Sequence, residues 1–466
     1  MKVVVTDLGI LKQAEFTVGD LTVICGANNT GKTYATYALY GFLTFWNEAF
    51  VHSFIGNDDY GELMKQGSAK IMLDGLNKTK DNIIDIACKS YTINLPMVFG
   101  ADERYFTKSS FYVRIEDVDF CCIDKRVQTK SPNEVALCDI VKVRNESFLT
   151  INIIANSEEI KKVHKEWFLH QINSGIQDIL FSEVFPEPFI ASIERTGAAM
   201  FQKELDIYRN WLLERVSNRE KEINPFDLIN SSYTDKRYAL PVRRDVDFIR
   251  DLENVAKHES PITKETPEIS KKFAELAGGA YRATREGIYY IPKKSKVKLT
   301  MGESASSVRS LLNLGMYILH IARPGDFLMI DEPELNLHPK NQRLMARLLA
   351  KLVNAGVKVF ITTHSDYILK EFNTLIMLKN SDSTTGRRVM EKYDYQENEL
   401  LDASRIKAYI AKKALVEMDG NSRRQKHNTF KQAPIEKDGI EIADFDETIN
   451  DMNKIQEEIM FGELAV

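Results

Sequence analysis

Three short apolar runs are prominent in the chain, at residues 21–25, 327–330 and 357–361. Uninterrupted runs of this length are typical of strands that are buried on both faces of a sheet. Apolar residues at helical spacing follow the first run, over residues 33–45. The pattern therefore predicts strand–helix units of an α/β fold.

The middle of the chain changes from a strand pattern to a helical one. Residues 110–115, 135–143 and 148–154 predict the antiparallel part of an N-terminal lobe. Apolar residues then recur at helical spacing over 157–179 and again over 201–216. Between these two segments, the run at 189–193 predicts a core strand that returns to the main sheet.

A helical arm is predicted from about Thr196 to Gly278. Its apolar stripe is typical of core packing or of a coiled-coil seam, and the arm is therefore expected to contact other proteins. A hairpin is expected after the arm, over residues 281–299, with its turn at Glu286-Gly287.

The C-terminal part predicts two more strands, a linker and a final helix. Strands are expected near residues 374–378 and 388–393, and a loop or linker over 419–434. Residues 446–460 have helical spacing of apolar residues, and this face is expected to dock on the parent domain. The residues that form the face are Ile449, Met452, Ile455 and Ile459.

Length and composition indicate a cytoplasmic protein of two or three domains. The chain has 466 residues, 44% of them hydrophobic, which suffices for a substantial core. Its five cysteines show neither CxxC spacing nor a histidine at metal-ligand distance, as expected for reduced thiols. The opening residues predict a strand and not a signal peptide, and the most apolar stretch, 34–50, is short for a membrane span. No membrane association is expected.

The net charge of −5 argues against attraction of nucleic acid to the whole chain. Direct nucleic-acid binding at a local basic groove stays open. Two basic clusters lie at residues 293–298 and 422–427. Because aromatic residues are not interleaved with them, solvated loops are the first interpretation.

Candidate chemistry begins directly after the first apolar run, where residues 26–33 have the sequence GANNTGKT. A glycine-rich turn between a strand and a helix points backbone N–H groups at one spot, where phosphates bind. The motif predicts an ATP site in which Lys32 reaches the β and γ phosphates and Thr33 holds Mg²⁺. The residues expected to form it are Gly26, Asn28, Asn29, Thr30, Gly31, Lys32 and Thr33.

Two further segments complete this site. The second run ends in Asp331 and Glu332, which is the form of a Walker B element. Asp331 is predicted to hold Mg²⁺ through water, and Glu332 to polarise the attacking water. The third run leads to His364 at a carboxyl end, where ligands of open α/β sheets bind, so His364 is predicted to touch the γ phosphate. The alternatives are an acidic turn and a structural histidine.

The order of P-loop, Asp331-Glu332 and His364 resembles the ABC-type ATPases of the SMC and OLD (overcoming lysogenisation defect) groups. Residues 334–339, ELNLHP, are similar to the D-loop segment of those groups. The resemblance implies an α/β, ABC-type P-loop ATPase with two lobes, a mixed sheet and an antiparallel β part. The 331 − 26 = 305 positions between Gly26 and Asp331 leave room for the inserted helical or coiled-coil arm.

The signature motif departs from that family pattern. ABC proteins place LSGGQ or a relative at the start of the helix before Walker B, where this chain has SASSVRSL at residues 304–311. Ser306 and the helix N-terminus are expected to contact a phosphate on a partner subunit. Ser307 stands where those proteins have glycine.

These elements predict four regions. They are an N-terminal ATPase lobe with the P-loop at residues 1–155, a core strand plus helical arm at 156–278, a C-terminal ATPase lobe at 279–400, and an extension with an amphipathic helix at 401–466.

Residues 193–197, IERTG, resemble the turn that follows such a strand in OLD-like and related defence ATPases. With the chain length, the N-terminal opening and the lack of a fused nuclease, the whole chain is similar to the ATPase subunits of PARIS (phage anti-restriction-induced) systems. That resemblance implies an ATP-dependent sensor that forms a homo-oligomer, a dimer at least and a hexamer in the larger case. It would hold a TOPRIM nuclease effector and release it when a phage anti-restriction protein, a DNA mimic, is sensed.

Three alternatives stay open. An OLD-type or Septu-type ATPase would use the same core with a different nuclease partner. An SMC-like DNA repair ATPase would need a longer heptad arm than the stretch of about 80 residues available here. A transporter ATPase would not carry the long insertion or the altered signature.

Overall fold

The computed structural model describes residues 1–49, 54–115, 118–131, 134–156, 159–160, 163–201, 238–418, 421–441 and 443–461. It divides into two compact units. Unit 1 consists of Met1–Val4, Gly41–Leu95 and Ser109–Glu187, and unit 2 consists of Val5–Tyr40, Pro96–Lys108 and Pro188–Val466. Every residue that the sequence predicts for the nucleotide site belongs to unit 2.

Unit 1 is built around an antiparallel four-stranded sheet with the order β4-β8-β7-β6. Helix α6 (Lys165–Phe181) packs on β6 and β7. The packing is close at Gly175, where a Cβ would lie 2.6 Å from Ile140 Cδ1 and would displace the end of that side chain. The other elements are α2 (Asn57–Gln66), β4 (Ser68–Met72), α3 (Asp74–Ile93), β5 (Ser110–Arg114), β6 (Lys125–Lys130), β7 (Ala136–Lys142) and β8 (Phe148–Ile153).

The predicted antiparallel part is confirmed for two of its three runs. The runs at 135–143 and 148–154 form β7 and β8, which pair with each other. The run at 110–115 forms β5, but this strand is not a member of the four-stranded sheet.

Unit 2 contains a mixed sheet with the P-loop strand near its centre. Its order is β1-β2-β16-β15-β3-β14-β13-β9, and β15, β3, β14, β13 and β9 run parallel. The predicted core strands appear as β3, β13, β14 and β9, and all residues of β3 and β13 are buried. The bounds are β1 (Lys2–Leu8), β2 (Leu11–Thr17), β3 (Leu21–Cys25), β9 (Pro188–Ala191), β13 (Phe327–Asp331), β14 (Lys358–Thr363), β15 (Ile406–Met418) and β16 (Asn421–Gln432).

Helices and a small sheet complete unit 2. Helix α15 begins with proline at its first position, where the missing N–H costs no hydrogen bond, and His338 Nδ1 caps it by accepting from the Lys340 N–H. In the described part of the chain, no helix is both long and apolar enough to cross a membrane. The helices are α1 (Lys32–Ala49), α4 (Leu95–Phe99), α7 (Arg195–Met200), α10 (Leu240–Arg250), α11 (Leu252–Val255), α12 (Pro261–Glu265), α13 (Pro267–Ala277), α14 (Ser306–His320), α15 (Pro339–Asn354), α16 (Asp366–Asn380), α17 (Ser383–Tyr393) and α18 (Ala443–Phe461).

The hairpin predicted over residues 281–299 is confirmed. Strands β10 (Gly279–Thr284) and β11 (Gly287–Pro292) pair antiparallel, with Thr284 opposite Gly287. A short third strand, β12 (Leu299–Thr300), joins β11 and leads toward α14. Strands β17 (Ile435–Glu436) and β18 (Gly439–Ile440) form a separate pair.

Two predicted strands are wrong. Residues 374–378 belong to α16 and residues 388–393 to α17. The apolar residues of 374–378 continue a helical series, because Ile368, Leu369, Phe372, Leu375 and Ile376 are all buried on α16. Five residues are too few to show a helical period, so residues 374–378 alone have the pattern of a short strand.

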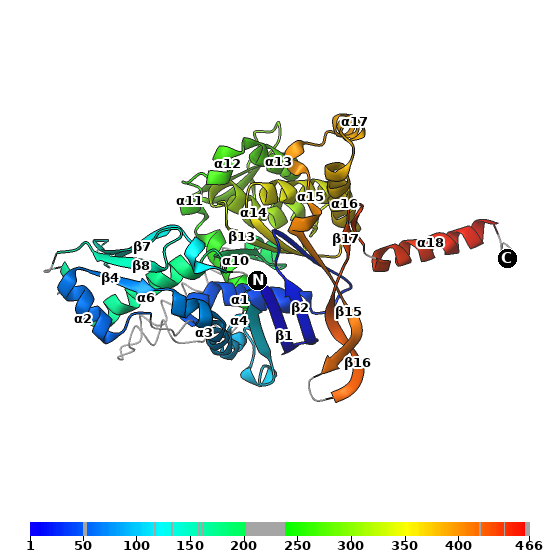
Figure 1. Cartoon of the computed structure of the whole chain (residues 1–466). Helices are drawn as coiled ribbons and strands as arrows, with labels where there is room; N and C mark the ends of the chain where they lie inside the picture. Colours follow the sequence, from blue (N-terminus) through cyan, green and yellow to red (C-terminus); the bar gives the residue numbers. More distant parts are fainter. Residues whose placement is uncertain are drawn as a thin grey trace, which may run out of the picture. The chain divides into compact units, whose positions relative to one another are not determined.

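The predicted linker at 419–434 is also wrong. Residues 421–432 form β16, which pairs antiparallel with β15 in a long twisted hairpin (Figure 1). Its composition is polar, because only part of the strand is covered; Phe430 is buried while Lys426 and Lys431 are exposed. The Asp419-Gly420 pair, a common hairpin turn, was the available signal, and it lies outside the described residues.

The predicted arm is described only in part. Most of the helical segment at 201–216 lies outside the described residues. The described remainder of the arm forms α7 and the helices α10 to α13.

The final helix forms as predicted, as α18. Its apolar face does not dock on the parent domain, since Met452, Ile455 and Ile459 are 56%, 57% and 79% exposed. Figure 1 shows α18 extending away from β17.

A buried charge cluster joins α13 and α15 to the turn at Glu397–Glu399. Glu399 is fully buried, and its carboxylate accepts a 2.8 Å hydrogen bond from Arg347 Nε. Lys272 Nζ and Lys351 Nζ lie 3.3 and 3.6 Å from Glu399 Oε1. One carboxylate therefore pairs with three buried cations, of which Lys272 also pairs with Glu275 at 3.4 Å.

We predict that Glu399→Gln destabilises the protein strongly, because Arg347, Lys351 and Lys272 each lose an ion pair and, among the described residues, only Lys272 keeps another, with Glu275. Breaking a buried pair in this way costs about 3–5 kcal/mol of unfolding free energy. Urea denaturation followed by circular dichroism measures the loss. Glu397→Gln, an exposed change in the same turn, is the control and should cost less than about 0.5 kcal/mol. Equal effects of the two variants would contradict the prediction.

Candidate active site

The P-loop has a backbone that only glycine can adopt at two positions. Gly26 has φ +135°, and a Cβ there would lie 2.3 Å from the carbonyl oxygen of Ala411 on β15. Gly31 has φ +100°, and its Cβ would lie 2.5 Å from Leu11 Cγ. Asn29 also has positive φ, and Ala27, Asn28 and Asn29 are exposed. The loop therefore presents an open turn before α1, as a phosphate-binding loop requires.

Lys32 lies inside this loop. Its Nζ donates to the carbonyl oxygens of Gly26 and Ala27 at 3.0 and 2.9 Å. Burial lowers the pKa of Lys32, while the nearby carboxylates of Asp331 and Glu332 oppose this effect. A buried cation at the head of the loop suits the binding of phosphate oxygens.

Thr33 and Asp331 meet across the sheet. Thr33 Oγ1 donates a 3.1 Å hydrogen bond to Asp331 Oδ2, and Thr362 on β14 donates to Asp331 Oδ1. Burial raises the pKa of Asp331, which these two hydrogen bonds partly offset. A hydroxyl beside a carboxylate is the ligand pair that Mg²⁺ takes when phosphates and waters supply the rest. Thr33 and Asp331 are thus the side chains whose oxygens would fit Mg²⁺.

Glu332 is held in a strained position next to His364. Its φ of +52° is in the left-handed region, which costs a non-glycine residue about 1–2 kcal/mol. His364 Nε2 lies 3.4 Å from Glu332 Oε1. The hydrogen bond with His364 lowers the pKa of Glu332, against the effect of burial. Glu332 is therefore ionised at neutral pH and only half-buried, as a group that orients water must be.

Glu334 fixes the main chain of the predicted switch histidine. Its carboxylate accepts from the His364 N–H at 2.6 Å and from Thr363 Oγ1 at 2.9 Å. Burial raises the pKa of Glu334, and these hydrogen bonds oppose it. The segment then enters α16, whose first turn is capped by Ser365 Oγ. Sequence reasoning assigned no such role to Glu334, since a carboxylate that binds a distant main chain has no motif.

Arg195 is a second functional residue that sequence reasoning missed. It lies in the IERTG turn after β9 and is 2% exposed. Its guanidinium donates to the carbonyl oxygens of Asp331 and Glu332, at 2.7 Å each. The resemblance of the turn to defence ATPases was the only signal, and it did not indicate a contact with Walker B.

Ser306 does not join the site of its own chain. It is exposed at the first position of α14, and no hydrogen bond links its hydroxyl to the P-loop within the described ranges. The chain thus brings together Lys32, Thr33, Asp331, Glu332 and His364, and leaves Ser306 outside this group.

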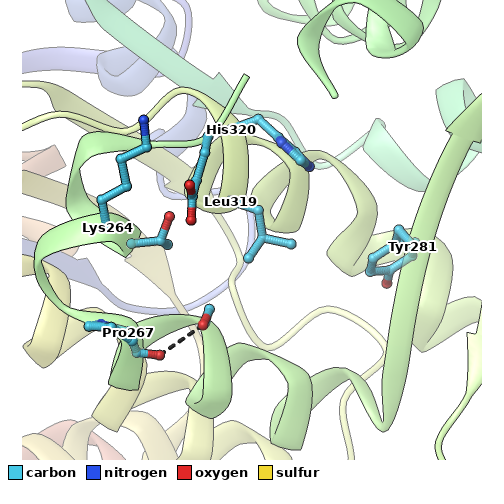
Figure 2. A pocket seen from close by; sticks show the side chains of 8 residues that line it. Lys264, Pro267, Tyr281, Leu319 and His320 are labelled. Carbon is cyan, nitrogen blue, oxygen red and sulfur yellow. Dashed lines mark hydrogen bonds between the residues drawn. The ribbon is translucent and has the colours of Figure 1, made fainter. Parts of the chain in front are cut away.

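A separate pocket lies elsewhere in unit 2 (Figure 2). It has a volume of about 540 Å³ and is lined in part by Lys264, Pro267, Tyr281, Leu319 and His320. His320, one of the lining residues, is held by a hydrogen bond between its Nδ1 and the carbonyl oxygen of His258, at 2.6 Å. No P-loop or Walker B residue lines this pocket, and it is not the nucleotide site.

Comparison with protein families gives the same class. A family model described as an AAA ATPase domain, AAA_15, matches residues 1–369, which include the P-loop, Asp331, Glu332 and His364. The chain belongs to the AAA ATPase domain family. Family membership makes the protein an ATPase in the broad sense, with a nucleotide site at the P-loop. The sequence-based assignment to the broad class of P-loop ATPases is confirmed by this match.

Solved structures of SMC heads are similar to this ATPase over most of its length. The SMC head bound to the C-terminal winged-helix domain of ScpA has 12% identity and a TM-score of 0.32, covering 94% of this chain and 98% of its own. The SMC head with an extended coiled coil bound to the C-terminal domain of ScpA, from Pyrococcus furiosus, has 12% identity and a TM-score of 0.30, with 98% of each chain covered. The SMC head domain from Thermotoga maritima has 12% identity and a TM-score of 0.25, covering 79% of this chain and 90% of its own. Scores of this size do not carry the fold assignment, which follows from the sheet order and the family match.

No curated protein matches the sequence.

We predict that Lys32 and Glu332 separate nucleotide binding from turnover. Lys32→Ala should abolish ATP binding, because the loop loses its only buried cation among residues 26–33. Glu332→Gln should still bind ATP but lose turnover by roughly 10²–10⁴-fold, the usual loss for a catalytic acid or base. Equilibrium binding of a fluorescent ATP analogue and release of phosphate measure the two effects. Glu397→Gln is the control, and wild-type turnover in Glu332→Gln would rule out the assignment of Glu332.

Proposed function

We propose that this protein binds and hydrolyses ATP as the sensor and scaffold of a bacterial anti-phage defence system, similar to AriA, the ATPase subunit of PARIS. The observation that carries the ATPase part is the convergence of Lys32, Thr33, Asp331, Glu332 and His364 at the carboxyl edge of β3, β13 and β14. A cation, two metal-binding oxygens and an ionised carboxylate are the groups that phosphoryl transfer to water requires.

Mg²⁺ and ATP fit this set, with phosphate oxygens and waters supplying the other Mg²⁺ ligands. Thr33 and Asp331 would hold the ion, and it would offset the negative charge of the bound phosphates. Lys32 would bind phosphate oxygens from the other side of the loop. Glu332 would accept a hydrogen bond from the attacking water, with His364 beside it.

The position of Ser306 supports a composite site. Its hydroxyl is exposed at the start of a 15-residue helix, where the first N–H groups have no partner in the helix. In our proposal, Ser306 of one subunit completes the site of another, so the active form is a homo-oligomer, either a dimer or a larger ring such as a hexamer.

The sensor part of the proposal rests on the resemblance to PARIS and on an exposed basic loop. Lys293, Lys294, Lys296 and Lys298 are exposed between β11 and β12. A phage protein that mimics DNA carries dense negative charge, which such a loop would attract. Nuclease activity would come from a TOPRIM partner that the ATPase holds and then releases.

We predict that defects at Ser306 and Lys32 complement each other. Ser306→Arg removes the serine that a subunit contributes to the nucleotide site of its neighbour. Lys32→Ala inactivates the P-loop of the subunit that carries it. Co-expressed in equal amounts and pairing at random, the two inactive chains should recover about a quarter of wild-type turnover per pair. The measurement is phosphate release by the co-purified mixture. No recovery at any ratio would place the whole site within one subunit.

We predict that growth arrest requires three components. The ATPase, the neighbouring gene product and an acidic DNA-mimic protein should arrest growth together, and no pair of them should do so. Lys293→Glu with Lys296→Glu should prevent arrest while ATP turnover is unchanged, because only the receptor loop is altered. Lys379→Glu with Lys437→Glu, two exposed changes elsewhere in unit 2, is the charge-matched control.

Each other outcome of this experiment points to a different function. Arrest by the ATPase alone would favour a self-sufficient effector. A different nuclease as the neighbouring gene product would favour an OLD-type or Septu-type system. Turnover stimulated by DNA, without any effect of the mimic protein, would favour an SMC-like repair ATPase.

A further inference from the structure

Arg195 is a buried arginine whose recorded hydrogen bonds all go to main-chain carbonyl oxygens. Nη1 donates to Ser192 and Asp331 at 2.7 Å each, Nη2 to Glu332 at 2.7 Å, and Nε to Ser310 at 2.9 Å. These carbonyls belong to three separate segments, namely the end of β9, the end of β13 with the residue after it, and α14. One side chain therefore ties the end of β9 to two segments that lie more than a hundred positions further along the chain.

This contact acts on the strained residue of the site. The Glu332 N–H donates to the Thr362 carbonyl oxygen at 3.1 Å, and its own carbonyl accepts from Arg195. The left-handed φ of Glu332 is unfavourable by itself. It persists because hydrogen bonds fix both the N–H and the carbonyl group of this residue. The direction of the Glu332 carboxylate toward His364 follows from that backbone conformation.

Arg347, a buried arginine with a structural role, differs from Arg195 in its hydrogen-bond partners. Its Nε donates to the Glu399 carboxylate at 2.8 Å, and its charge is neutralised directly. Arg195 makes no recorded ion pair with a carboxylate in the described part of the chain, although Asp245, Asp331, Glu334 and Glu332 lie near enough to act on it through space. The positively charged guanidinium of Arg195 therefore lies against the main chain of Asp331 and Glu332.

Asp245 secures the segments to which Arg195 binds. It is 1% exposed on α10, and it accepts from the Ser192 N–H at 3.0 Å and from Asn313 Nδ2 at 2.7 Å. Asn313 lies on α14, one turn after the carbonyl that Arg195 binds. The end of β9 and α14 are thus joined twice, by Asp245 and by Arg195.

We propose that Arg195 is the positioning residue for Glu332, and that it couples the catalytic carboxylate to α14, the helix that carries Ser306. A shift of α14 would pull on the same guanidinium that holds the Glu332 carbonyl. The carboxylate is then correctly placed only while α14 and the end of β9 keep their present contacts. This inference rests on the proposed hydrolysis of ATP.

The test is Arg195→Lys, which keeps the charge but replaces a five-donor fork with one nitrogen that cannot reach three segments. We expect kcat to fall by about 100-fold, the effect of misplacing a catalytic group by about 1 Å. KM for ATP and the number of nucleotides bound per chain should stay within about threefold of wild type, because the P-loop is untouched. In Arg195→Ala, added guanidinium should restore part of kcat, whereas methylammonium should not.

Arg347→Lys is the matched control, because it changes another buried arginine in the same unit. Both variants should melt at lower temperature than wild type, but Arg347→Lys should keep the wild-type kcat per bound nucleotide. Hydrogen exchange of the peptide covering residues 331–335 should accelerate in Arg195→Lys and not in Arg347→Lys.

A loss of turnover in Arg195→Lys that only matches a loss of bound nucleotide would overturn the inference, because it would reflect unfolded protein. Unchanged exchange at residues 331–335 would overturn it as well, whatever the turnover. If wild type itself fails to hydrolyse ATP, the proposed function fails, and the exchange measurement still decides whether Arg195 holds Glu332.

Discussion

Parallel pairing of β14 with β3 on one side and β13 on the other is the constraint on which the site depends. The register places Thr363 beside Cys25, directly before the P-loop, and Thr362 beside Asp331. Carboxyl ends of neighbouring parallel strands meet at one edge, so residues that lie 331 − 33 = 298 positions apart come within hydrogen-bond distance. A slip of one residue in either pair would turn Asp331 or Thr362 to the opposite face and separate Thr33 from its carboxylate.

The same edge concentrates negative charge. Asp331, Glu332 and Glu334 lie there, against the two cations Lys32 and Arg195. Burial raises the pKa of Asp331 and of Glu334, because removing these carboxylates from water disfavours their charged form. A bound cation would offset this excess of carboxylate, and the oxygen atoms of Thr33 and Asp331 suit Mg²⁺. The strain at Glu332 adds to the cost of burying these carboxylates and is offset by hydrogen bonds on both of its sides.

The sequence predicts well what is local and poorly what depends on distant partners. The P-loop, the Walker B strand and His364 could be found because each has its chemistry and its strand within a few residues. Arg195 and Glu334 could not, since they bind distant segments mostly through main-chain atoms, and any residue type would present the same carbonyl or N–H. The errors have a similar cause. The polar strand β16 exists because β15 is beside it, and residues 374–378 have strand-like composition but are buried at helical spacing.

The C-terminal part of the chain is structurally inseparable from the nucleotide site. The AAA ATPase family match ends at residue 369, yet β15 begins at Ile406 and pairs with β3 along the whole length of that strand, from Leu21 to Cys25. Without β15, the P-loop strand would be an edge strand with unpaired main-chain groups. The approach of Ala411 to Gly26 shows that β15 also forms one wall of the loop itself, and the Cys25 thiol donates to the Tyr409 carbonyl at 3.4 Å beside it. Strand β15, which lies beyond the matched domain, is therefore part of the frame that holds the P-loop strand and its first glycine in place.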